Sequence, residues 1–136
     1  MRKFFVFVLV MVLALSLTGL AHAQDPVTLR LAGWASSPAE DAALQTMLDA
    51  FMAANPDIKV EFGPLPEYAT TMQTAFASGD YAEVFYVNSD VFNSWADAGV
   101  IADGSSLIEN PDDIYPALRN MFTKDGTLYC PAKDYS

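Results

Sequence analysis

The chain has 136 residues and a formal net charge of −10, from 17 acidic and seven basic side chains. This length suits one domain, and the acidic balance argues against nucleic acids and anionic membrane surfaces as partners, because both would repel it. The single cysteine, Cys130, cannot form an internal disulfide bond.

The first 23 residues have the pattern of a secretory signal peptide. Arg2 and Lys3 give a positive start, an apolar run covers 4–20, and small residues end at Ala23 before a polar stretch. An uncleaved membrane anchor is the alternative, because the run just reaches the lower length limit of a span. We expect cleavage after Ala23, and therefore a periplasmic or extracellular mature chain, 24–136.

Removal of this leader also removes His22, the one histidine of the chain. A mature chain without histidine has no Ser-His-Asp triad, no Cys-His pair and no histidine metal site. No cysteine lies near residue 24, where an exported lipoprotein would carry its lipid.

The mature sequence begins with a strand pattern and a well-marked helix. Alternating apolar side chains predict a strand over 27–33. Ser37 as N-cap, Pro38 at the first helical position and Glu40 three residues after the cap predict a helix over about 37–54. Its apolar stripe consists of Leu44, Met47, Leu48 and Phe51.

The alternation continues through a second strand over 58–62. A helix follows in which Tyr68, Met72 and Phe76 share one face, and Gly79 ends it. The nearly unbroken apolar run 83–87 is typical of a strand covered on both faces.

Asn88, Ser89 and Asp90 then offer N-caps to a short helix that carries Phe92 and Trp95 and ends at Gly99. We expect a further helix over about 114–122. Asp125-Gly126 is the dipeptide that a type I′ hairpin turn prefers.

This order of elements predicts an α/β fold with a parallel-rich sheet and helices on both faces. Ligands of such sheets bind beyond the carboxyl ends of the strands, which directs attention to the loops 33–37, 63–68 and 88–90. Aromatic faces and uncharged polar groups in these loops suit a neutral polyhydroxylated ligand, whereas a phosphate site would need Arg, Lys or a Gly-rich turn. The candidate residues are Trp34, Ser36, Tyr68, Asn88, Ser89 and Asp90.

Several of these residues also have a purely structural interpretation. Asp90 can cap a helix, just as Ser37 does, and Tyr68 can begin the buried face of its helix. Trp95 lies on a helical apolar stripe and is expected in the core. Trp34 follows a strand in a polar loop, so both burial and ligand contact stay open.

Five segments together resemble family 1 extracellular solute-binding proteins, the maltose-binding-like receptors of ABC sugar importers. They are "VTLRLAGW", "MLDAFMAANPDIKVEF", "TAFASGDYAEVFYVNS", "WADAGVIADGSSLI" and "FTKDGTLYCPAKDYS", preceded by the signal peptide. The resemblance implies a type II periplasmic-binding fold, of which 24–136 would be the N-terminal lobe only, truncated at the first hinge crossing. It also implies no catalysis, no cofactor, a small neutral sugar or oligosaccharide as ligand, and an ABC permease in the membrane as partner.

The resemblance further implies where ligand contacts lie. They would come from the loops Gly33–Ser36 and Asn88–Asp90 and from the hinge segment Lys133–Ser136, which adds Asp134 and Tyr135 to the candidates. Two positions depart from the family. Relatives commonly have Pro-Asp in place of Ala82-Glu83, and Gly in place of Cys130, which we expect to be a small buried residue rather than a reactive thiol.

Two other interpretations stay open. The chain could belong to a secreted carbohydrate-active hydrolase, with Asp90 and Glu67 as an acid/base pair. It could also be a non-functional truncation, since Ser136 is expected to interrupt a longer protein.

Overall fold

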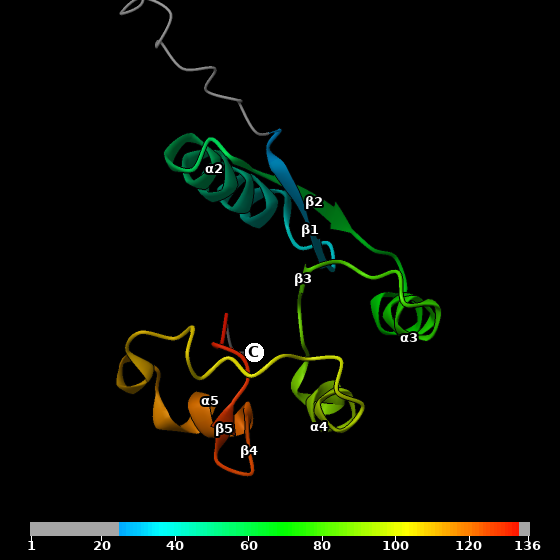
Figure 1. Ribbon diagram of the computed structural model, residues 1–136, viewed down its shortest axis with the longest axis vertical. Coiled ribbons are helices and arrows are strands. Elements are labelled where there is room, and N and C mark those ends of the chain that lie inside the picture. The colour runs from blue at the N-terminus through cyan, green and yellow to red at the C-terminus, as the bar shows by residue number, and fades with distance from the viewer. Residues whose placement is uncertain (1–24, 134–136) are drawn as a thin grey trace, which may run out of the picture.

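Strands and helices alternate along most of the chain, around a central sheet (Figure 1). The structure is a computed structural model that describes residues 25–133. The predicted signal peptide, 1–23, and the candidate residues Asp134 and Tyr135 therefore lie outside the described residues. Within 25–133, no helix combines the length and the hydrophobicity that a membrane span requires. The elements are β1 (Val27–Gly33), α2 (Pro38–Ala54), β2 (Ile58–Pro64), α3 (Tyr68–Ser78), β3 (Val84–Phe85), α4 (Ser89–Asp97), η1 (Pro111–Asp113), α5 (Pro116–Met121), β4 (Thr123–Lys124) and β5 (Thr127–Leu128).

The central sheet has the strand order β2-β1-β3, and both pairings are parallel. β1 and β2 pair over their full lengths, from Val27 opposite Ile58 to Gly33 opposite Pro64. Because parallel neighbours need a crossover, α2 connects β1 to β2 and α3 connects β2 to β3. The predicted parallel α/β architecture is confirmed.

Helices lie on both faces of this sheet, as expected. The backbone N–H of Val60 lies 3.2 Å from the Met52 sulfur, which places α2 near that residue. Met72 of α3 instead packs with Ala32 of β1. In Figure 1, α2 and α3 accordingly lie at different sides of the strands.

The first helix begins where its sequence predicts. The Ser37 side chain accepts a 3.2 Å hydrogen bond from the backbone N–H of Glu40, and Pro38 occupies the first helical position. The apolar stripe is covered only in part: within the described residues Leu44 and Leu48 are half-buried, whereas Met47 is 68% exposed.

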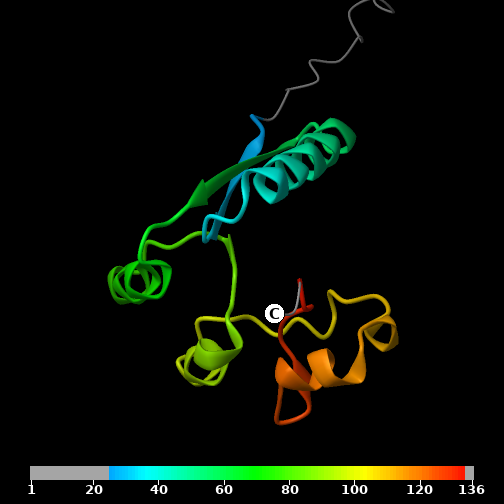
Figure 2. The same ribbon diagram turned by 180° about the vertical axis from the view of Figure 1, so that it is seen from behind.

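Two hydrophobic clusters form the core, and α4 contributes to both. Trp95 is 4% exposed and belongs to a cluster with Ala32, Met72 and Ala82, which confirms its predicted core position. Phe92, one helical turn earlier, packs with Phe122 and Leu128 in the second cluster. α4 therefore connects the sheet to the C-terminal group of α5, β4 and β5, which lies beside α4 in Figure 1 and Figure 2.

The C-terminal half follows the predictions with small differences. The helix expected over 114–122 is α5, which starts later, at Pro116, because proline suits the first helical turn. The hairpin turn is confirmed: Asp125 and Gly126 both have positive φ, as a type I′ turn requires.

The strand predicted over 83–87 is the main error of the sequence analysis. β3 contains only Val84 and Phe85, and Val84 is 50% exposed rather than covered on both faces. For the first residue of the predicted strand the reason lies at Glu83 itself, whose carboxylate accepts the backbone N–H of Arg30 at 2.8 Å. A side chain thus takes the donor that a longer β3 would have bound with a backbone carbonyl.

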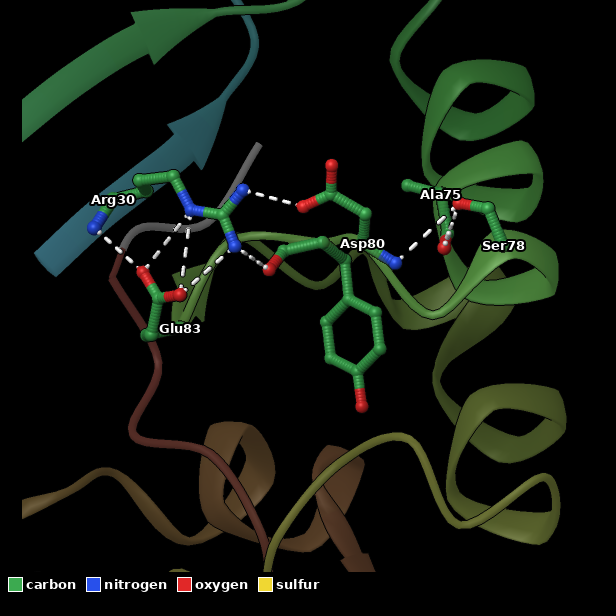
Figure 3. Close-up of polar contacts among 6 residues, drawn as sticks. Arg30, Ala75, Ser78, Asp80 and Glu83 are labelled. Carbon is green, nitrogen blue, oxygen red and sulfur yellow. Dashed lines mark hydrogen bonds and ion pairs between the residues drawn. The ribbon is translucent and has the colours of Figure 1, made fainter.

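Arg30 makes further contacts that tie β1 to the segment before β3 (Figure 3). Its guanidinium donates to Asp80 at 2.7 Å, to the Tyr81 carbonyl at 2.6 Å and to Glu83 at 2.9 Å. The hydrogen bonds that Glu83 accepts from the Arg30 side chain and backbone lower the pKa of Glu83 to about 2. Glu83, one of the two positions that depart from the resembled family, thus has a defined structural role.

Gly104 brings a second pair of distant segments together. A Cβ atom at this buried glycine would lie only 2.2 Å from the carbonyl oxygen of Tyr129. Next to it, Ser105 Oγ accepts from Leu128 N at 3.2 Å and donates to Leu128 O at 3.3 Å. The loop around Gly104 therefore packs against β5 and against the segment that follows β5.

Replacing Glu83 with Gln should lower the melting temperature near neutral pH and remove part of the acid sensitivity. The folded-state pKa of Glu83, about 2, lies below its ordinary value of 4.5. Its carboxylate therefore stabilises the fold above pH 4.5, and this contribution is lost as the pH falls toward 2. Circular dichroism melts of both proteins should show the difference closing over that interval.

Glu61→Gln is the matched control, because Glu61 pairs with Lys59 of the same strand, β2, at 2.6 Å and only through side chains. A difference between wild type and Glu83→Gln that stays constant down to pH 2 would contradict the proposed role.

Replacing Gly104 with Ala should destabilise the protein by about 1–3 kcal/mol, the usual cost of forcing atoms into a packed site. Gly63→Ala is the control, since a Cβ there meets nothing within 4 Å. Urea unfolding of the two variants measures the difference. Equal stabilities would show that the approach of Gly104 to Tyr129 is not a constraint.

Candidate functional site

Three aromatic rings meet where the strands of the sheet end. Trp34 follows β1, Tyr68 starts α3 and Tyr86 follows β3. The Trp34 ring lies 5.3 Å from Tyr68 and 4.9 Å from Tyr86, centroid to centroid, in edge-to-face arrangements. We call these three residues the aromatic cluster. Its place at the carboxyl ends of parallel strands is the one where ligands of such folds bind.

The hydroxyl group of Tyr68 has a structural role. The hydroxyl donates a 2.7 Å hydrogen bond to the backbone carbonyl of Tyr86. Burial raises the pKa of Tyr68 well above its ordinary value, so the phenol stays neutral and remains a donor. Its ring also packs against the cluster of Met72 and Trp95, as a residue that begins a buried helical face would.

Tyr86 is the residue that the sequence analysis missed. The strand predicted over 83–87 contains Tyr86, which is therefore not among the candidate residues. Because β3 ends at Phe85, Tyr86 is the first residue of the following loop. A Cβ on Gly33 would lie 2.5 Å from the Tyr86 ring, so the ring packs directly on the bare backbone at the end of β1. A predicted strand end two residues earlier, at Phe85, would have placed Tyr86 in the loop.

The loop after β1 leads directly into α2. Ser36 is half-buried, and its backbone N–H lies 3.4 Å from the Asp41 carboxylate. Ser37 caps α2 with its side chain, as predicted. Trp34 is half-buried and packs on two tyrosines, so part of its surface stays exposed.

The loop after β3 presents three exposed polar residues, Asn88, Ser89 and Asp90. Asn88 is the N-cap of α4 through its backbone, because its carbonyl accepts from Phe92 N at 3.0 Å. Ser89 and Asp90 lie in the first turn of the helix, so Asp90 is not the cap that the sequence also allowed. Their part in ligand binding stays a prediction.

The segment 129–133, which we call the exit segment, returns to this region from the C-terminal hairpin. Lys133 Nζ lies 2.6 Å from Glu40 Oε1, at the start of α2, and 5.3 Å from the centroid of the Tyr86 ring. The red end of the ribbon accordingly runs from the hairpin toward the sheet in Figure 2. Asp134 and Tyr135, the candidates that follow Lys133, lie outside the described residues.

Cys130, the second departure from the family pattern, lies in the exit segment. It is half-buried against the cluster of Phe92, Phe122 and Leu128, and burial raises the pKa of its thiol. A raised thiol pKa lowers the fraction of reactive thiolate, in keeping with the predicted packing role. Between residues 25 and 133, no group of three or more His, Cys, Asp or Glu side chains could hold a metal ion.

Comparison with known structures shows a shared fold. An ABC substrate-binding protein from Listeria monocytogenes, solved in complex with cycloalternan, is 32% identical with a TM-score of 0.67. The match covers 77% of this chain and 28% of that protein. A family 1 extracellular solute-binding protein from Alicyclobacillus acidocaldarius is 27% identical with a TM-score of 0.64, over 79% of this chain and 28% of its own. The fold is that of type II periplasmic binding proteins.

Sequence comparison agrees. An uncharacterized lipoprotein from Streptomyces antibioticus is 34% identical over 90 residues, which are 65% of this chain and 20% of that protein. The chain thus spans less than a third of the length of these relatives. The bacterial extracellular solute-binding protein family matches residues 34–131, most of the described region. The chain therefore belongs to the bacterial extracellular solute-binding protein family.

Proposed function

We propose that this chain is the N-terminal lobe, 24–136, of the substrate-binding component of an ABC transporter, and that it contacts a neutral sugar or oligosaccharide. The aromatic cluster at the carboxyl ends of the strands carries this proposal. It joins a partly exposed Trp34 to a loop of exposed hydroxyl, amide and carboxylate groups at 88–90. Ring faces suit the C–H side of a sugar, and these polar groups suit its hydroxyls.

The ligand class is supported by charge and by a relative. The cation next to the cluster, Lys133, already pairs with Glu40, so it does not leave an unbalanced positive charge for a phosphate. The Listeria protein, which is 32% identical, was solved with the sugar cycloalternan. Both observations favour a neutral sugar over an anionic solute.

One lobe provides one wall of the ligand site. Trp34 would stack on the sugar, Asn88, Ser89 and Asp90 would bind hydroxyls, and Asp134 and Tyr135 would contribute from the hinge. In a protein of the relatives' length, a second lobe would supply the opposite wall. Ligand would then favour the closed form, because it touches both walls only there.

We favour binding over catalysis. The hydrolase alternative requires Asp90 and Glu67 to act as an acid/base pair, and an acid of that kind is usually set in an apolar pocket. Both side chains are exposed. The matching family and the Listeria relative are binding proteins.

The proposed setting follows from the family. Its members are extracellular, and we expect this chain to be exported after cleavage behind Ala23 and to deliver its ligand to a membrane permease. We expect neither a cofactor nor a nucleic-acid partner.

Titration of the 136-residue chain with cycloalternan, followed by NMR, tests the site. Because one wall is present, we expect weak binding, with a dissociation constant of about 1 mM or higher. The Trp34 indole signal and the backbone signals of 88–90 should shift, and Trp34→Ala should abolish these shifts.

Tyr115→Ala is the matched control, since Tyr115 is an aromatic residue that is 75% exposed and lies in the loop before α5. It should leave the titration unchanged. Micromolar binding would contradict the one-wall proposal, and shifts that persist in Trp34→Ala would contradict the assignment of the site.

A further inference from the structure

We propose that Lys133 is a positioning residue, which fixes the Tyr86 ring from one side and thereby orients Trp34. The functional meaning of this inference rests on the proposed function, in which Trp34 is the surface that meets the sugar. The structural part does not, because it concerns only contacts within the chain.

The Lys133 ammonium is held by two contacts from different elements. Glu40, in the first turn of α2, accepts at 2.6 Å, and the centroid of the Tyr86 ring lies 5.3 Å away. The second distance falls within the range in which a cation is attracted to the face of an aromatic ring. A lysine stem is flexible, so two simultaneous contacts restrict it far more than one. The pair also joins residues 93 positions apart in the sequence.

Tyr86 is connected to the rest of the site on its other sides. Its ring lies 4.9 Å from Trp34 and 6.4 Å from Phe62 between centroids. It also leaves no room for a Cβ on Gly33, and its carbonyl accepts the Tyr68 hydroxyl. Gly33 and Tyr68 fix the position of the Tyr86 backbone. A displacement of the Tyr86 ring would therefore change its contact with Trp34 first.

This arrangement assigns different tasks to the two rings. A cation over Tyr86 occupies ring surface that a sugar would otherwise use, so Tyr86 acts as a support. Trp34, which is half-buried and packs edge-to-face on that support, is the ring that remains for stacking. The docking of the exit segment therefore prepares the wall of the site before any ligand arrives.

NMR of the 136-residue chain without ligand tests the inference. The chain has two tryptophans, so Trp34 and Trp95 give separate indole N–H signals, which Trp34→Phe assigns. Lys133→Met keeps the apolar stem but removes the charge, and it should move the Trp34 signal while Trp95 stays in place. Lys133→Arg should restore the wild-type position, because a guanidinium can both pair with Glu40 and stack on Tyr86.

Glu40→Gln should move the Trp34 signal in the same direction, and the double variant should move it no further than Lys133→Met alone. Salt at about 1 M, which shortens the screening length to about 3 Å, should shift the wild type toward Lys133→Met. Lys59→Met is the control, because Lys59 has an ion pair of the same 2.6 Å length, with Glu61 on β2. It should leave Trp34 unchanged.

Two results would overturn the inference: a Trp34 signal that does not respond to Lys133→Met, or one that moves together with Trp95 and so reports a change of the whole fold. Neither result involves a sugar. A positive NMR result with failed cycloalternan binding would therefore reject the proposed function alone.

Discussion

Arg30 holds the third strand of the sheet in its place, and the candidate site depends on that strand. β3 shares only two register pairs with β1, so backbone pairing alone gives it little support. The Arg30 guanidinium adds hydrogen bonds to Asp80, the Tyr81 carbonyl and Glu83, which fix the segment before β3. The Arg30 backbone N–H donates a further hydrogen bond to Glu83. These groups are exposed and screened by water, so the geometry of several converging bonds matters more than the strength of any one.

From β3 the constraint passes directly to the aromatic cluster. Tyr86 N donates to the Ala32 carbonyl at 3.0 Å, and one residue further Gly33 leaves space for the Tyr86 ring. The next helix, α4, then divides its two buried aromatics between the two hydrophobic clusters, Trp95 to the sheet and Phe92 to the hairpin. The exit segment packs against this second cluster and places Lys133 over the Tyr86 ring. Tyr86 is thus contacted both by the end of β1 and by the exit segment.

The parts that could be predicted from sequence are those specified by neighbouring residues. Ser37, Pro38 and Glu40 mark a helix start, and Asp125-Gly126 marks a turn, because their chemistry acts within four positions. Trp34 and the loop 88–90 could be placed near one another, because parallel strands end at the same edge. The late start of β3 could not, since it depends on a carboxylate that binds Arg30 from 53 positions away. The role of Tyr86 could not either, because its ring packs on Trp34 and Gly33, which are distant in the sequence. Neither could the contact of Lys133 with Glu40, for the same reason.

The internal contacts of the aromatic cluster bear on how such a site would work. A binding site must offset the loss of translational and rotational freedom, a cost of about 4–15 kcal/mol, and each mobile side chain that becomes fixed adds to it. Even a pair of aromatic rings gains only about 0.5–1.5 kcal/mol beyond the burial of its surface, so one ring contact lies far below that cost. A wall of this kind is therefore useful only if its rings are already fixed and if a second surface adds its own contacts. The rings of this wall are already restricted without ligand, because Tyr86 or its ring is contacted by Tyr68, Gly33 and Lys133. We infer that these contacts serve preorganisation and that, under the proposed function, most of the affinity must come from a second surface that closes over the aromatic cluster.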